Sequence, residues 1–233
     1  MNYENEIIRY CKKNRISTTE VADALGKNGV FKGAVPINTG KHCVGKVRTI
    51  FTAFDSNYEL HDQITNVEED EVVIIFAHKC DDRAIIGDLV AKYLVLYKSA
   101  TAIIIDGLIR DVAGIKRENY PIWSKGFTPL GCYNKETDVF PLDLKAEIKD
   151  IYEEGIAICD DGGVTIIHRD LVNSKTLDRL ERIEKQEDIW FYCLDTLKWS
   201  TKKIVCDKAY LTEPDLFPKN YFNNIEDLKN PLD

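Results

Sequence analysis

Two short, strongly apolar runs separated by a helical pattern constrain the fold more than any other feature of this sequence. The first run lies in "DEVVIIFAH", where residues 72–77 form a predicted strand, and the second is "TAIIIDG". Between them, "KCDDRAII" is a predicted loop, and "GDLVAKYLVLYKSA" predicts an apolar helix that begins at Gly87 and Asp88. Strand, loop, helix and strand within about thirty residues make a βαβ unit. We therefore predict an α/β protein in which these two strands are parallel neighbours.

The segments on either side extend this pattern. Ser17 or Thr18 begins a predicted helix, because either side chain can cap it and Glu20 can complete a capping box. Alternating apolar residues over positions 44–51 predict strands, and "DSNYELHDQITNVEE" predicts a helix. "YPIWSKGFTPL" predicts a short strand, and "EGIAICDDGGVTIIH" predicts a hairpin.

The C-terminal part has a different pattern. A charged helix is predicted over residues 174–197, and its apolar stripe is formed by Leu177, Leu180, Ile183, Trp190 and Leu194. The tail that follows contains three prolines and shows little periodicity. The sequence thus predicts one α/β domain with a central sheet over residues 1–172, and a C-terminal helix and tail over residues 173–233 that pack on that domain or on a neighbouring subunit.

Composition and charge exclude several classes of protein. The chain has 233 residues, a net charge of −8 and 44% hydrophobic residues, which suits one medium-sized domain. The acidic balance and the lack of a basic stripe argue against a nucleic-acid partner. No window approaches the ~20 apolar residues of a membrane span, and the N-terminus has no secretory signal. We therefore expect a cytoplasmic protein that does not bind a membrane.

The cysteines and histidines show no metal-binding pattern. There are seven cysteines, an odd number at scattered positions, and no CxxC motif occurs. This usage indicates reduced thiols, and neither a disulfide framework nor a zinc site. Cys159 lies within an apolar alternation and is a predicted core residue. The four histidines are isolated, so a structural or surface role is expected for each.

Polar side chains follow the two strands of the βαβ unit at one edge of the predicted sheet. Ligands of open α/β sheets bind beyond the carboxyl ends of the strands, where "KCDDRAIIGD" and "DGLIRD" both lie. A helix N-terminus there attracts an anion, and the planar guanidinium of Arg110 suits a carboxylate or phosphate. The carboxylates of Asp88 and Asp111 suit a hard divalent cation. The alternative is that Arg110 and Asp111 form surface ion pairs and that Asp88 only caps its helix.

Five segments resemble, in order, the RraA-like family: "STTEVADAL", "GDLVA", "IIIDGLIRD", "YPIWSKGFTP" and "GIAICDDGGVTII". The family motif is a Gly and an acidic residue, then about twenty residues, then Arg-Asp, and here it reads Gly87-Asp88 and Arg110-Asp111. The resemblance covers residues 16–172 and implies an α/β domain of the swivelling β/β/α type. The family includes the 4-hydroxy-4-methyl-2-oxoglutarate aldolases, which are class II pyruvate aldolases with oxaloacetate decarboxylase side activity.

The resemblance implies a role for each residue of the motif. Asp111 would hold Mg²⁺ or Mn²⁺, partly through waters, and Asp88 would orient a metal-bound water that carries protons. Arg110 would bind the carboxylate of the 2-oxo acid substrate. It would share that carboxylate with the backbone amides of Gly87, Asp88, Leu89 and Val90.

The resemblance also implies an assembly. Proteins of this family are usually homotrimers or homohexamers with sites at subunit contacts, and an acidic residue from the C-terminal helix of a neighbouring subunit completes each site. Glu187 or Glu184 could play that part here, although a solvated helix face explains either residue equally well.

The implied activity is metal-dependent cleavage of a 4-hydroxy-2-oxo acid to pyruvate, with decarboxylation of oxaloacetate beside it. Both reactions leave a pyruvate enolate, whose charge a divalent metal stabilises as a Lewis acid. A Schiff-base mechanism with Lys79 or Lys92 is a lesser alternative. A second alternative is a non-catalytic RraA-like protein that binds and regulates a ribonuclease or another protein partner. The presence of both Asp88 and Asp111 favours the enzyme.

The sequence departs from the family pattern in two places near the motif. Twenty-one residues, one more than expected, separate Asp88 from Arg110. The first strand of the βαβ unit ends in "FAHKC", where family members usually have a turn rich in Asp and Gly. The extra residue can lie at the end of the helix and leave the site intact, whereas the second departure concerns loop shape and therefore substrate preference.

Overall fold

The two apolar runs form neighbouring parallel strands, as predicted, in a computed structural model that describes residues 2–229. β3 (Val72–His78) and β5 (Ala102–Ile109) lie side by side, with Ile74 opposite Ile104. Both strands are buried on both faces for most of their length, which explains why they are continuously apolar. The helix between them begins at Asp88, as the sequence predicts, with α4 (Asp88–Lys92), and continues as a π-helix (Tyr93–Tyr97).

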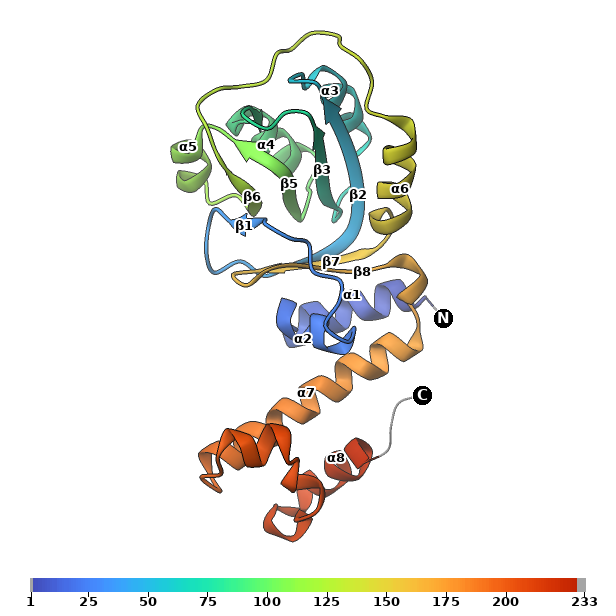
Figure 1. The fold of residues 1–233 in the computed structure, drawn as a ribbon, viewed down its shortest axis with the longest axis vertical. Coiled ribbons are helices and arrows are strands. Elements are labelled where there is room, and N and C mark those ends of the chain that lie inside the picture. The colour runs from blue at the N-terminus through green and yellow to red at the C-terminus, as the bar shows by residue number, and fades with distance from the viewer. Residues whose placement is uncertain (1, 230–233) are drawn as a thin grey trace.

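The strands belong to one mixed sheet with the order β1-β6-β5-β3-β2-β7-β8, and β4 pairs with β5 beside this path (Figure 1). β2, β3, β5 and β6 are mutually parallel, whereas β7 and β8 form the predicted antiparallel hairpin. The remaining strands are β1 (Val35–Pro36), β2 (Cys43–Ala53), β4 (Ala84–Ile86), β6 (Ile122–Phe127), β7 (Ile156–Asp160) and β8 (Gly163–Ile167).

β2 is the longest strand and joins two parts of the sheet. Its first residues, Cys43–Lys46, pair antiparallel with β7, and from Val47 onward it pairs parallel with β3. The hairpin therefore turns under the parallel strands, as Figure 1 shows. This arrangement confirms the predicted α/β fold with a central sheet that contains a βαβ unit.

Helices cover the sheet in layers. On one face of the parallel strands lie α3 (Tyr58–Gln63), α4 and α5 (Val112–Arg117), and on the other lie α6 (Leu142–Tyr152) and the hairpin. The outer face of the hairpin packs on α1 (Tyr3–Asn14), α2 (Thr18–Ala24) and α7 (Ser174–Asp195). The predicted capping box is present in α2: the Ser17 hydroxyl accepts from the Glu20 amide at 3.1 Å, and the Glu20 carboxylate accepts from the Ser17 amide at 2.7 Å.

The structure corrects the boundaries expected around the βαβ unit. The segment expected to be entirely a loop after β3 contains β4, and the second strand runs on to Ile109, well past Ile105. The reason is that β4 pairs with the far end of β5, so that the backbone stays extended beyond the apolar run. Residues 3–14 and 112–117 form helices that the sequence analysis did not identify.

The C-terminal segment is helical and has its own core. After α7, short helical turns lead to α8 (Lys219–Lys229), which packs back on the distal half of α7. Leu194, expected in the buried stripe of α7, is 42% exposed, because Ile189 and Cys193 face this small core instead. Within residues 2–229, no helix combines the length and apolarity needed to cross a membrane.

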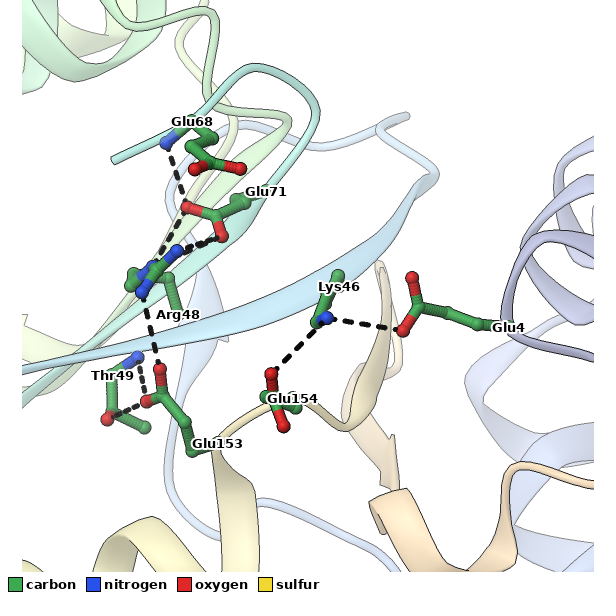
Figure 2. Close-up of polar contacts among 8 residues, drawn as sticks. All are labelled: Glu4, Lys46, Arg48, Thr49, Glu68, Glu71, Glu153 and Glu154. Carbon is green, nitrogen blue, oxygen red and sulfur yellow. Dashed lines mark hydrogen bonds and ion pairs between the residues drawn. The ribbon is translucent and has the colours of Figure 1, made fainter. Parts of the chain in front are cut away.

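A buried ion pair ties β2 to the start of β3 at the sheet end opposite Arg110. The Glu71 carboxylate, only 8% exposed, accepts from the Arg48 guanidinium at 2.8 and 3.1 Å and from the Glu68 amide at 2.9 Å (Figure 2). A carboxylate buried to this extent is tolerated because charged and polar donors surround it. Glu4 and Lys46, also drawn in Figure 2, pair at 3.3 Å with about a third of each side chain exposed.

We expect Glu71→Gln to lower the free energy of unfolding by about 2 kcal/mol, since the charge-assisted bonds to Arg48 are lost and Arg48 recovers only part of its solvation. Denaturant unfolding followed by circular dichroism measures this change. Glu4→Gln is the matched control, and its loss should stay below about 0.5 kcal/mol because the pair with Lys46 is solvated. Equal losses in the two variants would contradict the role given to Glu71.

Candidate functional site

The pairing of β4 with β5 brings together the two loops that carry the sequence motif. Ala84 lies opposite Leu108 and Ile86 opposite Ile109, and the Arg110 amide donates to the Ile86 carbonyl at 3.0 Å. Gly87, which follows β4, therefore lies beside Arg110, which follows β5. The structure thus places the predicted residues Gly87–Val90, Arg110 and Asp111 around one cavity of about 110 Å³.

Asp111 is the polar centre of this group. Its Oδ2 atom lies 3.4 Å from Arg110 Nε and accepts from the Asp88 amide at 3.4 Å. The side chains of Arg110 and Asp111 are 49% and 42% exposed, so both can meet a ligand from solvent. The Asp111 backbone is left-handed, with φ 57° and ψ 32°, which Asp adopts more readily than most residues. This conformation ends β5 and starts α5.

Two glycines let the backbone approach these side chains closely. A Cβ atom at Gly87 would lie 2.2 Å from Asp111 Oδ2, and one at Gly131 would lie 2.5 Å from Arg110 Nη1. Neither glycine has a positive φ, so glycine is not favoured here by the backbone conformation. The close contact with a neighbouring side chain is what favours glycine at both positions. The Arg110 guanidinium accordingly rests against the segment that follows β6.

The first turn of α4 forms another wall of the cavity. The Asp88, Leu89 and Val90 amides belong to this turn, where backbone N–H groups have no intrahelical acceptor and attract an anion. The Leu89 side chain points outward and is 78% exposed. The Asp88 carboxylate lies against Gly114 of α5, where a Cβ atom would come within 3.1 Å of Oδ2.

The structure adds polar residues to the cavity that the sequence analysis did not identify. Asn57 lies at the start of α3 and donates to the Ile85 carbonyl at 3.1 Å, but its buried Oδ1 atom has no hydrogen-bond partner among residues 2–229. A buried amide oxygen without a partner is costly, so Asn57 is an energetically unfavourable polar position in the wall of the cavity. No local motif identifies these positions, because they come from two regions distant along the chain, α3 with its first cap and the segment after β6: Asn57, His61, Gly131, Cys132 and Asn134.

The carboxylates fit a divalent cation of the magnesium type. Across residues 2–229, no three His, Cys, Asp or Glu side chains converge as a metal site. The carboxylates that one chain offers to a cation in this cavity are those of Asp88 and Asp111, so water or ligand oxygens would complete most of its shell. Mg²⁺ commonly binds in this way, through one or two carboxylates with several waters retained. The donor set does not fit a structural zinc site, which needs four protein ligands.

The lysine alternative receives no support from the geometry. Among the described residues, none of those that line the cavity is a lysine. Lys79 Nζ lies over the Phe54 ring, 5.1 Å from its centroid, and Lys92 is exposed on α4. A Schiff-base lysine needs to face the substrate, which neither residue does.

Glu184 and Glu187 lie on α7, which packs outside the hairpin, far from α4 within the same chain (Figure 1). The Glu184 carboxylate accepts from the Tyr10 hydroxyl and from Asn14 Nδ2 at 3.4 Å. Glu187 has no hydrogen-bond partner among the described residues. Burial, followed by the charges of Glu20, Asp23 and Asp188, raises the pKa of Glu187. Of the two candidates, only Glu187 thus has a free carboxylate.

Sequence comparison supports one family. A family model described as RraA-like, Aldolase/RraA, matches residues 18–166. A relative from Halalkalibacterium halodurans, named "Putative 4-hydroxy-4-methyl-2-oxoglutarate aldolase", is 29% identical over 158 residues, which cover 65% of this chain and 72% of that protein. Protein DlpA of Legionella pneumophila is 28% identical over 190 residues, 72% of this chain but only 30% of its own length.

Solved structures share the fold. A crystal structure of an uncharacterized Pseudomonas syringae protein matches with a TM-score of 0.66 and 22% identity, covering 82% of this chain and 89% of that one. Streptomyces coelicolor RraAS2, described as an unusual member of the RNase ES inhibitor RraA protein family, matches with a TM-score of 0.60 and 19% identity, covering 78% and 92%. At these identities the likeness establishes the fold alone.

We expect Gly131→Ala to weaken the binding of a small carboxylate such as oxalate about tenfold, or ~1.4 kcal/mol, because the new methyl group displaces the Arg110 guanidinium. Isothermal titration calorimetry measures the affinity. Gly26→Ala is the control: it strains a left-handed turn with φ 69° away from the cavity, so it should lower the melting temperature and leave the affinity unchanged. Unchanged affinity in Gly131→Ala would show that Arg110 does not bind the anion.

Glu187→Gln should raise the melting temperature at pH 7, and Glu184→Gln should lower it. The raised pKa of Glu187 means that its ionised form opposes folding at neutral pH. Below the ordinary carboxyl pKa, Glu187 is protonated in both the folded and the unfolded state. The gain in melting temperature from Glu187→Gln should therefore vanish there. Glu184 instead supplies an acceptor to Tyr10 that an amide replaces poorly. Thermal unfolding at pH 7 and pH 4 compares the variants, and destabilisation by both at pH 7 would contradict this distinction.

Proposed function

Because this chain belongs to the RraA-like family, we propose that it is a divalent-metal-dependent carbon–carbon lyase. Its reaction cleaves a 4-hydroxy-2-oxo acid, such as 4-hydroxy-4-methyl-2-oxoglutarate, to pyruvate, with decarboxylation of oxaloacetate as a second activity. The observation that carries the proposal is the convergence of Asp88, Arg110 and Asp111 on one cavity at the carboxyl ends of the parallel strands.

Arg110 binds the substrate carboxylate in this proposal. Its guanidinium lies at the cavity wall, half exposed, where an incoming carboxylate can replace Asp111 as its partner at shorter distance. The amides of the first α4 turn lie beside it and add donors for the same anion. Together these groups orient the 2-oxo acid and leave its reacting carbons toward Asp88.

Asp111 would hold Mg²⁺ or Mn²⁺, directly or through water, and Asp88 would orient a water on the cation. When bound, such a cation supplies Lewis-acid stabilisation for the charge that develops on the 2-oxo acid. Asp111 is pre-positioned for this by the Asp88 amide and by its own left-handed backbone, which restrict its side chain. Its Oδ2 atom also lies 3.4 Å from Arg110 Nε, a contact that further restrains the side chain.

Asp88 handles the proton in both reactions. In the aldol cleavage, a carboxylate oxygen of Asp88 accepts the proton of the 4-hydroxyl, directly or through water, as the C3–C4 bond breaks and a carbonyl forms at C4. The same proton returns to C3 of the resulting enolate, which gives pyruvate. In the decarboxylation, carbon dioxide leaves from C3 and a proton takes its place.

Asn57 binds the hydroxyl group of the substrate in this proposal. Asn57 lines the cavity, and its Nδ2 atom donates to the Ile85 carbonyl. Its Oδ1 atom has no partner among the described residues and is fully buried, so a ligand would reach it after a small side-chain shift. A neutral acceptor of this kind can accept a hydrogen bond from a substrate hydroxyl or a water. The gain in binding free energy is large, because in the unbound protein the buried oxygen has no hydrogen bond.

In an oligomer, Glu187 is the better candidate for the acid that a neighbouring subunit contributes. Its carboxylate is free, whereas Tyr10 and Asn14 occupy Glu184. A nearby cation would reverse the repulsion from Glu20 and Asp23 that raises the Glu187 pKa. A homotrimer or homohexamer with sites at the subunit contacts is part of this proposal.

The alternative function is regulation of a ribonuclease or another protein by a non-catalytic protein of the same fold. RraAS2, a structural neighbour, is described as belonging to an inhibitor family, although its likeness extends only to the fold. The presence of both carboxylates beside Arg110 favours the enzyme, because protein binding alone gives no reason for a cation-type donor set at a cavity.

The test is pyruvate release from oxaloacetate and from 4-hydroxy-4-methyl-2-oxoglutarate with Mg²⁺, with Mn²⁺ and with a chelator. Arg110→Lys should lower kcat/KM about a hundredfold, ~2.7 kcal/mol, since a lysine cannot bind the carboxylate in the bidentate manner. Asp111→Asn should abolish the metal-dependent release of pyruvate. Arg117→Lys, an exposed change on α5, is the control. Absence of release with either metal from the folded wild-type protein would refute the proposed substrates.

A further inference from the structure

Two thiols from distant parts of the chain meet at the wall of the cavity. Cys80 lies in the loop between β3 and β4, and Cys132 lies in the segment after β6. Asp55 ties the two segments together, because its amide donates to the Lys79 carbonyl at 3.1 Å and its carbonyl accepts from the Tyr133 amide at 2.8 Å. Cys80 belongs to a buried hydrophobic cluster against which Cys132 packs. Cys80 is 3% exposed, whereas Cys132 is partly exposed and lines the cavity, so a small solute that enters the cavity meets Cys132, with Cys80 behind it.

The backbone around the two thiols is held on both sides. The Cys132 amide donates to the Ala84 carbonyl at 3.1 Å, and the Ala84 amide donates to the Leu130 carbonyl at 2.7 Å. Arg83 adds a side-chain bond, from Nη1 to the Gly131 carbonyl at 2.9 Å. Thiols that pack near each other between segments fixed in this way can be joined by a small shift of one segment.

The chemistry of this pair differs from that of the other buried thiols. The Cys132 side chain, together with backbone groups of Asp55 and Ser56, lowers the pKa of Cys80 despite its burial. Thiolate character of this kind is what makes a cysteine react with an oxidant. By contrast, burial raises the pKa of Cys11, Cys43, Cys159 and Cys193.

We propose that Cys80 and Cys132 are an oxidisable pair that forms a disulfide under hydroperoxides and thereby disturbs the anion-binding cavity. The Cys80 thiolate attacks a peroxide oxygen and becomes a sulfenic acid, with hydroxide as the leaving group, which takes up a proton to become water. The Cys132 sulfur then attacks the Cys80 sulfur, and a second water leaves. In total, two thiols are oxidised by two electrons and one hydrogen peroxide is reduced to two waters.

The link to the cavity is the neighbour of Cys132. Gly131 lies against the Arg110 guanidinium so closely that it has no room for a Cβ atom. Forming the bond draws the two sulfurs together to about 2.05 Å, so the segment that supports Arg110 shifts. Oxidation should therefore weaken the binding of a small carboxylate about tenfold, and a reductant should restore it.

The experiment treats the full-length reduced protein with hydrogen peroxide and maps its peptides by mass spectrometry without reduction. We expect one linked pair of peptides, joined through Cys80 and Cys132, that dithiothreitol separates. Oxalate binding, measured by calorimetry on the oxidised and re-reduced protein, gives the second readout. The mapping does not depend on any enzymatic activity, so it can fail or succeed independently of the proposed lyase.

Two serine variants make the result specific. Cys132→Ser should abolish the linked peptide and protect oxalate binding from peroxide, whereas Cys206→Ser, at an exposed position in the C-terminal segment, should behave as wild type. Circular dichroism checks that both variants fold. Oxidation of Cys80 to a sulfinic acid without a link, or a link from Cys80 to another cysteine, would overturn the pairing. A formed link with unchanged oxalate affinity would overturn its effect on the cavity.

Discussion

The pairing of β4 with the end of β5 is the contact on which the candidate site depends. It extends β5 beyond its apolar run and places Gly87 next to Arg110. Without it, the helix start at Asp88 and the Arg-Asp pair would be two separate loops at the same sheet edge. Three strand residues therefore decide the distance between an anion-binding helix turn and a guanidinium, and the buried apolar side chains of β4 hold them in place.

The same region concentrates the unusual chemistry of the molecule. One cavity has at or beside it a left-handed Asp111, two glycines in close contact with side chains, a buried Asn57 oxygen and the thiols of Cys80 and Cys132. Features that cost stability persist where the surrounding structure holds them, and they tend to gather where a protein binds ligands. The opposite end of the sheet is secured by the buried Arg48–Glu71 pair (Figure 2).

The hairpin and the C-terminal helix separate two kinds of acidic residue. Asp88 and Asp111 face the cavity, whereas Glu184 and Glu187 lie beyond the hairpin on α7, which leads away from the α/β body to a small core of its own (Figure 1). A single chain therefore does not bring these acids together. This separation is consistent with a site shared between subunits, in which α7 of one chain reaches the cavity of another.

The sequence by itself determined the α/β class, because two continuous apolar runs on either side of a helical pattern are typical of buried parallel strands and of few other structures. It also determined the residues of the motif and the edge of the sheet where they lie, since parallel strands end on the same side. Only the tertiary structure decided that β4 exists, that the tail forms α8, and that Asn57, Gly131 and Cys132 reach the cavity. These features arise from contacts between segments distant along the chain, and local periodicity carries no information about such contacts.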